Sequence, residues 1–80
     1  MRASKIDRLV KMINQISLNM SSNGPADSVA IEVSEHLEKF WPPPMKNLIS
    51  ESSNDDTVGL TAISQKAVVL LAAIQKAKSI

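Results

Sequence analysis

The sequence predicts an all-α fold, a small irregular bundle of three long helices and one short helix. Two observations support this: apolar residues recur at helical spacing along most of the chain, and breaker-rich stretches separate the periodic segments. The breaks fall at residues 21–25, at the prolines 42–44 and at residues 50–57. Because the chain has 80 residues and no cysteine, we expect one helical domain over residues 1–80, near the lower size limit for a stable core.

The first helix is predicted from about Lys5 to Met20. Ser4 is a suitable N-cap, and Asp7 places an acid in the first turn. The apolar residues of this segment share an arc of about 120° at 100° per residue, and they are Ile6, Leu9, Val10, Ile13, Ile16 and Met20.

The second helix is predicted from Pro25, which suits a first turn, to Trp41, where Pro42 disfavours helical backbone. A short helix from about Pro43 to Glu51 follows. The apolar arc of the second helix consists of Ala26, Val29, Ala30, Val33, Leu37, Phe40 and Trp41.

The last helix is predicted from about Ala62 to Lys78, with Thr61 as its N-cap. It has two apolar faces, a main stripe and a second face opposite: Ile63, Ala67, Leu70, Leu71, Ile74 and Ala77 on the stripe, with Val68, Val69 and Ala72 on the far side. A surface helix of an isolated domain has one apolar stripe. This helix is therefore either sandwiched inside the fold or contacts another molecule through its second face. The second interpretation is favoured, because so small a bundle has few ways to surround a helix.

Both aromatic residues precede the triple proline, in the segment Phe40-Trp41-Pro42-Pro43-Pro44-Met45. One interpretation is a corner, in which the aromatic rings close the core and the prolines direct the next helix. The other is an anchor for a partner, because Trp and Met are common in binding surfaces. We expect Phe40 to point inward and Trp41 to be shared between core and partner. The predicted core consists of Ile6, Leu9, Val10, Ile13, Ile16, Val29, Val33, Leu37, Phe40, Leu48, Leu70, Leu71 and Ile74.

Catalytic chemistry has little support in the sequence. His36 is the only histidine, and Glu32 one turn earlier could bond to it, but no nucleophile is evident. The adjacent acids Asp55 and Asp56 fit a solvated loop better than an acid–base pair. We expect no catalytic, cofactor-binding or metal-binding residues.

Charge and hydropathy also argue against two classes of partner. A formal charge of +1 and only two aromatic residues give no footprint for nucleic acid. The longest apolar run, residues 67–74, is far shorter than the roughly 20 residues that span a bilayer. We expect a cytoplasmic protein that binds neither nucleic acid nor membrane.

Two motifs, in order, resemble the delta subunit of NAD-dependent, molybdenum-containing formate dehydrogenases. The first is Asp7 to Ile16, with the core Leu-Val-x-Met-x-Asn-Gln-Ile; the second is His36 to Met45, with His-aliphatic-x-x-Phe-Trp-x-Pro-x-Met. The Gly59-Leu60 pair before the last helix also fits. The resemblance covers most of residues 6–75.

The resemblance implies a non-catalytic accessory subunit that binds the large molybdenum subunit, for stability or for cofactor maturation. The complex, and not this chain, would carry molybdopterin, iron–sulfur clusters, FMN and NAD. Two alternatives stay open: a self-associating helical protein, dimeric in isolation, and a transient assembly chaperone. The predicted partner-binding residues are Phe40, Trp41, Pro43, Met45, Val68, Val69 and Ala72.

Overall fold

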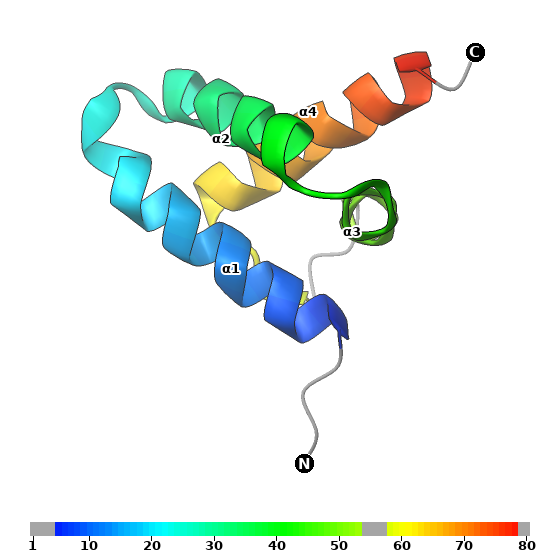
Figure 1. Cartoon of the computed structure of the whole chain (residues 1–80). Coiled ribbons are helices and arrows are strands. Elements are labelled where there is room, and N and C mark those ends of the chain that lie inside the picture. Colours follow the sequence, from blue (N-terminus) through cyan, green and yellow to red (C-terminus); the bar gives the residue numbers. More distant parts are fainter. Residues whose placement is uncertain (1–4, 54–57, 79–80) are drawn as a thin grey trace.

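The computed structural model describes residues 5–53 and 58–78, and within them it contains helices and no strand (Figure 1). The four α-helices are α1 (Lys5–Met20), α2 (Ala26–Phe40), α3 (Pro43–Ser50) and α4 (Ala62–Lys78). A short 3-10 turn, η1 (Ser21–Asn23), joins α1 to α2. The predicted all-α bundle with one short helix is confirmed.

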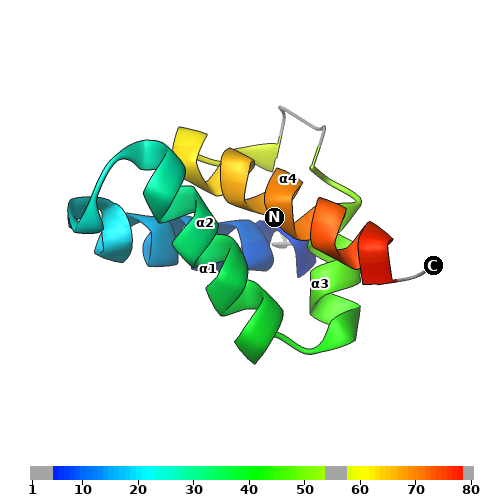
Figure 2. The same cartoon turned by 90° about the horizontal axis from the view of Figure 1, so that it is seen from above.

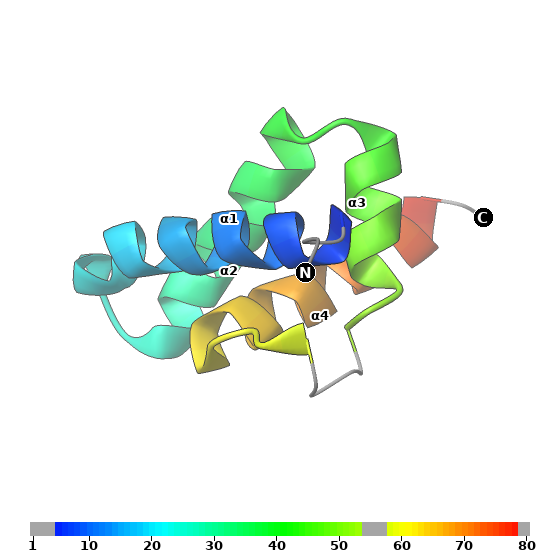
Figure 3. The same ribbon diagram turned by 90° about the horizontal axis from the view of Figure 1, so that it is seen from below.

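The helices pack as two crossed layers. Helix α4 makes its most extensive contacts with α2 and then with α3, and Figure 2 shows α2 and α4 side by side. Seen from below, α1 lies in front of α2 and runs across it (Figure 3), and α1 also contacts α4. The core therefore lies where α1 crosses the α2–α4 pair and where α3 closes one end.

Local chemistry explains the helix ends. Pro25 is the N-cap of α2, in an extended conformation, and Trp41 leaves that helix with φ −86° and ψ 136°, because the following proline excludes helical backbone. The predicted cap of α4 is confirmed, since Thr61 Oγ1 accepts a hydrogen bond from the Ser64 N–H at 3.3 Å. The predicted cap Ser4 lies outside the described residues.

The core combines residues of all four helices with the Trp41 side chain. Its buried apolar residues are Leu9, Val10, Ile13, Val29, Ala30, Val33, Leu37, Trp41, Ile49, Ala67, Val68 and Leu71. Of the other predicted core residues, Ile6, Ile16 and Leu48 pack partly buried against this cluster, and Ile74 is half-buried.

The predicted inward orientation of Phe40 is wrong, whereas Trp41 lies in the core; whether Trp41 also contacts a partner stays a prediction. Phe40 is 68% exposed and Trp41 only 7% exposed. Phe40 is the last helical residue of α2, and its ring lies beside that of His36, with 4.8 Å between the ring centroids. Trp41 is buried, in agreement with its place on the predicted apolar arc, although its backbone is extended and not helical.

The predicted inward stripe of α4 is also partly wrong. Val68 is fully buried, whereas Leu70 is 37% exposed. The buried face of α4 consists of Ser64, Ala67, Val68 and Leu71. Compared with the prediction, the helix is rotated so that Val68 replaces Leu70 in the core.

Candidate protein-interaction surface

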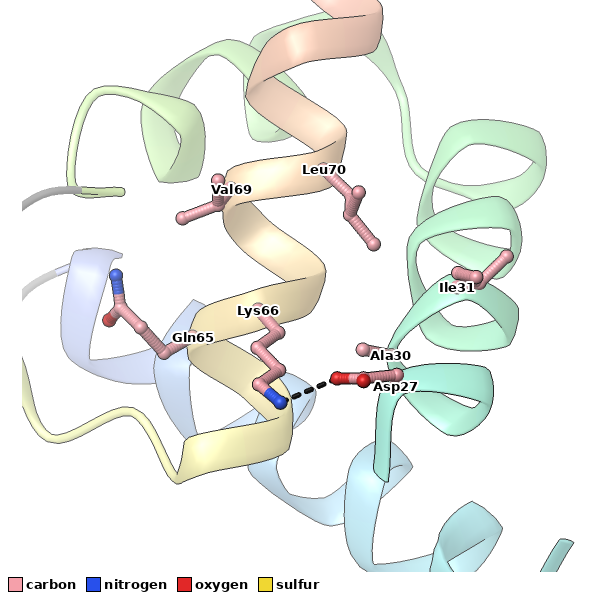
Figure 4. Close-up of a pocket in the computed structure, with 7 residues that line it drawn as sticks. All are labelled: Asp27, Ala30, Ile31, Gln65, Lys66, Val69 and Leu70. Atoms are coloured by element: carbon pink, nitrogen blue, oxygen red, sulfur yellow. Dashed lines mark hydrogen bonds and ion pairs between the residues drawn. The ribbon is translucent and has the colours of Figure 1, made fainter. Parts of the chain in front are cut away.

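An open groove of about 370 Å³ separates the first half of α2 from α4 (Figure 4). We call it the α2/α4 groove; its lining residues are Asp27, Ala30, Ile31, Gln65, Lys66, Val69 and Leu70. Three large apolar side chains in it remain accessible: Ile31 is 50%, Val69 46% and Leu70 37% exposed. The groove therefore presents accessible apolar surface that the described fold does not cover.

One end of the groove is polar. Lys66 Nζ lies 2.5 Å from Asp27 Oδ1, and this ion pair joins α4 to the start of α2. The hydrogen bond from Lys66, aided by its positive charge, lowers the pKa of the Asp27 carboxyl below its ordinary value of 3.8. An apolar centre with a polar rim is the arrangement that protein–protein interfaces commonly show.

A buried hydroxyl pair fixes which face of α4 points toward the groove. Ser17 Oγ of α1 lies 2.7 Å from Ser64 Oγ of α4, and both serines are buried. A rotation of α4 about its axis would break this bond and take the Ser64 hydroxyl away from the buried Ser17 hydroxyl, and a buried hydroxyl that loses its partner is costly. The pair therefore keeps Val69 and Leu70 on the outer side of the helix.

The Asn14 amide attaches the start of α4 to α1. Its Nδ2 donates to the Gly59 carbonyl at 3.0 Å, and its Oδ1 accepts from the Thr61 N–H at 3.0 Å. Gly59 has φ +89°, a conformation that favours glycine. The asparagine of the first motif thus contacts the segment containing Gly59-Leu60, so these separated sequence features meet in the fold.

Glu38 joins three helices at the other end of the molecule. Its carboxylate pairs with Lys46 of α3, at 3.4 Å, and with Lys78 of α4. Lys46 also donates to the Glu38 carbonyl oxygen at 3.1 Å. This arrangement holds the last turns of α4 against α2 and α3.

The predicted partner-binding residues do not form one surface. Val69 lines the α2/α4 groove, and Met45 lines a separate groove between α1 and α3. Phe40 and Pro43 are exposed, Ala72 is half-buried, and Trp41 and Val68 are buried in the core. Their role in partner binding stays a prediction.

Sequence reasoning missed five residues of the α2/α4 groove: Asp27, Ile31, Gln65, Lys66 and, as an outward residue, Leu70. A signal for Ile31 was present, since it is a large apolar residue outside the apolar arc of its helix. Met12 and Leu18 of α1 likewise lie outside the apolar arc of their helix, and both are exposed. The Asp27–Lys66 pair joins residues 39 apart in the sequence, and no local pattern links them.

A search of the described ranges for three or more His, Cys, Asp or Glu side chains that could hold a metal ion finds none. In the same ranges, no helix is long and apolar enough to cross a membrane.

These features define a class: a small helical module whose accessible apolar groove suits contact with another protein. The family model described as NADH-dependent formate dehydrogenase delta subunit, FdsD, matches residues 8–68. The chain therefore belongs to the formate dehydrogenase delta subunit family, as the sequence motifs predicted. No significant match was found among curated proteins or among solved structures.

Proposed function

We propose that this chain is a non-catalytic accessory subunit of a cytoplasmic NAD-dependent formate dehydrogenase. In this proposal it binds the large molybdenum subunit and keeps that subunit stable or competent to receive its cofactor. The chain binds no cofactor; molybdopterin, iron–sulfur clusters, FMN and NAD belong to the other subunits. The observation that carries the proposal is the exposed apolar α2/α4 groove in a member of this family.

The groove offers a favourable free energy of association. Full burial of a Val, Leu or Ile side chain contributes about 1.5–3 kcal/mol. Ile31, Val69 and Leu70 retain between 37% and 50% of their exposure, so covering each contributes about 1 kcal/mol by the same rule. A stable interface needs more than these three side chains, and we expect them to form its apolar centre.

A disruptive substitution in the groove tests the proposal. We expect Leu70→Asp to lower co-purification of the tagged chain with a co-expressed large subunit at least about tenfold, because binding would strip water from a carboxylate in the apolar part of the groove. Leu18→Asp is the matched control, since Leu18 is 66% exposed and lies outside the groove. Circular dichroism of both isolated variants checks that they stay helical.

The outcomes separate the possibilities. If both variants co-purify equally well with the large subunit, the α2/α4 groove is not part of the interface. Failure of the wild-type chain to co-purify would overturn the accessory-subunit proposal. A third outcome would instead support self-association. In that case the wild-type chain is dimeric by light scattering and does not bind the large subunit, and the Leu70→Asp variant is monomeric.

The role after binding needs its own measurement. We expect the large subunit expressed without this chain to contain less molybdenum, or to melt at a lower temperature, than when the two are co-expressed. If neither quantity changes, the chain has no role in stability or cofactor maturation.

A further inference from the structure

We propose that a second groove, between α1 and α3, binds a short acidic segment with apolar side chains from a protein partner. The α1/α3 groove has a volume of about 280 Å³, and its lining residues are Lys5, Arg8, Leu9, Met12, Pro44, Met45 and Leu48. It shares no lining residue with the α2/α4 groove. The inference therefore goes beyond the proposed docking on the large subunit and can be tested separately.

One wall of the α1/α3 groove is a single face of α1. Lys5, Arg8, Leu9 and Met12 have the spacing i, i+3, i+4 and i+7, which aligns side chains along a helix. Leu9 is buried, whereas Met12 is 45% exposed. The wall therefore combines a fixed apolar base, an accessible thioether and two cations at its N-terminal end.

The opposite wall comes from α3. Met45 and Leu48 are half-buried and present apolar surface, and Pro44 lies in the first turn of the helix. The proline ring restricts the backbone at this end of the wall. The flexible side chains of Met12 and Met45 can adapt to apolar side chains of different shape. The groove therefore suits an apolar side chain of a bound segment.

The charge of the groove selects the partner. Lys5 and Arg8 are exposed, and neither takes part in the ion pairs formed between residues within 5–53 and 58–78. Asp7 of α1 and Glu51, which directly follows α3, do not line the groove. Two cations beside an apolar floor are complementary to carboxylates beside an apolar side chain, and arginine can bind a carboxylate through two parallel hydrogen bonds.

The shape favours a protein segment over an anionic membrane. A helix that binds a membrane surface lays a broad apolar face flat on the lipid. Here the apolar residues lie in a recess between two helices, with Leu9 at only 6% exposure. A protruding side chain can reach that recess, whereas a flat lipid surface contacts its rim.

Methionine methyl resonances provide a direct test on the intact chain. The sequence has four methionines, of which Met12 and Met45 line the groove and Met20 does not. The probe is a synthetic peptide of alternating leucine pairs and glutamate pairs, compared with its counterpart carrying lysine in place of glutamate. We expect the acidic peptide to shift the Met12 and Met45 methyl signals of the isotope-labelled protein, to leave Met20 unshifted, and to bind more weakly as salt is added.

Charge reversal tests the selectivity. We expect Arg8→Glu to weaken the acidic peptide at least about tenfold and to strengthen the basic peptide. Lys11→Glu is the matched control, because Lys11 is an exposed cation of the same helix that does not line the groove; we expect it to change affinity by less than about twofold. Unchanged helical circular dichroism verifies the fold of both variants.

Several results would overturn the inference. They are the absence of methyl shifts with the acidic peptide, equal binding of the two peptides, and equal effects of Arg8→Glu and Lys11→Glu. Shifts of the same methyl signals by phosphatidylglycerol vesicles, with none from the acidic peptide, would assign the groove to a membrane surface instead.

Discussion

Replacing Ser64 by alanine should destabilise the chain, because the Ser64 hydroxyl is buried and hydrogen-bonded on two sides. Ser64 Oγ accepts a hydrogen bond from Thr61 Oγ1 at 2.9 Å and lies 2.7 Å from Ser17 Oγ. Since Thr61 donates to Ser64, the Ser64 proton is available for Ser17. Ser64 is 0% and Ser17 2% exposed, so water cannot take the place of a lost partner.

The expected loss follows from these two bonds. A neutral hydrogen bond contributes about 0.5–1.5 kcal/mol, and a buried hydroxyl left without a partner costs about 1–3 kcal/mol. We therefore expect Ser64→Ala to lower the free energy of unfolding by about 2 kcal/mol. In a domain of this size that corresponds to a melting temperature about 8–16 °C lower. The total stability of such a domain is about 4–12 kcal/mol, so the variant should still fold.

A double-mutant cycle isolates the bond between the two serines. Ser17→Ala combined with Ser64→Ala removes both hydroxyls and leaves neither serine partner unpaired, so the double variant should cost about 1 kcal/mol less than the sum of the single variants. Urea unfolding followed by circular dichroism at 222 nm measures all four proteins. Ser28→Ala, at an exposed position of α2, controls for the higher helix propensity of alanine. Additive effects, or single variants no less stable than Ser28→Ala, would refute the reasoning.

Two further predictions concern the aromatic corner and the ion pair of the α2/α4 groove. In urea unfolding, Trp41→Ala should cost about 3–5 kcal/mol and Phe40→Ala less than about 1 kcal/mol, because Trp41 is buried and Phe40 exposed; the reverse order would contradict the structure. In a carboxyl NMR titration, Asp27 should ionise below 3.8, and Lys66→Gln should return its pKa toward that value. Because folding depresses this pKa, the stabilisation is present above 3.8 and is lost as pH falls through the lower, folded-state pKa. If the pKa of Asp27 is the same in the wild-type chain and in Lys66→Gln, the ion pair does not form in solution.

The helix boundaries could be predicted because their signals are local. Pro25 and Pro42 act on adjacent backbone, and Thr61 caps α4 through a residue three positions away. The third helix ends at Ser50, one residue before the predicted Glu51. Such signals require no knowledge of tertiary packing, so sequence alone is sufficient for them.

The exposure of Phe40 could not be predicted by the same reasoning. Helical spacing placed both Phe40 and Trp41 on the inward arc, but only Trp41 is buried, and Phe40 is exposed at the last helical position. The extended backbone of Trp41 allows a larger ring to enter the core at that end. When two aromatic residues are adjacent, filling that space with one excludes the other, and this competition is settled by tertiary packing.

The face of α4 was difficult to predict because its apolar residues lie nearly all round the helix. Because hydropathy differs little around the helix, helical spacing alone does not decide whether the inward face passes through Leu70 or through Val68. The discriminating residue is polar: Ser64 pairs with Ser17 and turns Val68 inward. Apolar periodicity gives no signal for such a serine, although Ser64 lies on the buried face with Ala67 and Leu71.

The same hydroxyl pair connects the core to the proposed interaction surface. By holding Ser64 against α1, it leaves Val69 and Leu70 opposite Ile31 across the α2/α4 groove. A change of α4 rotation would therefore alter the exposed apolar surface as well as the core. If the groove binds the large subunit as proposed, Ser64→Ala should weaken that complex without touching the partner, whereas Ser28→Ala should not. The buried hydroxyl pair would then control which apolar face the domain presents to its partner.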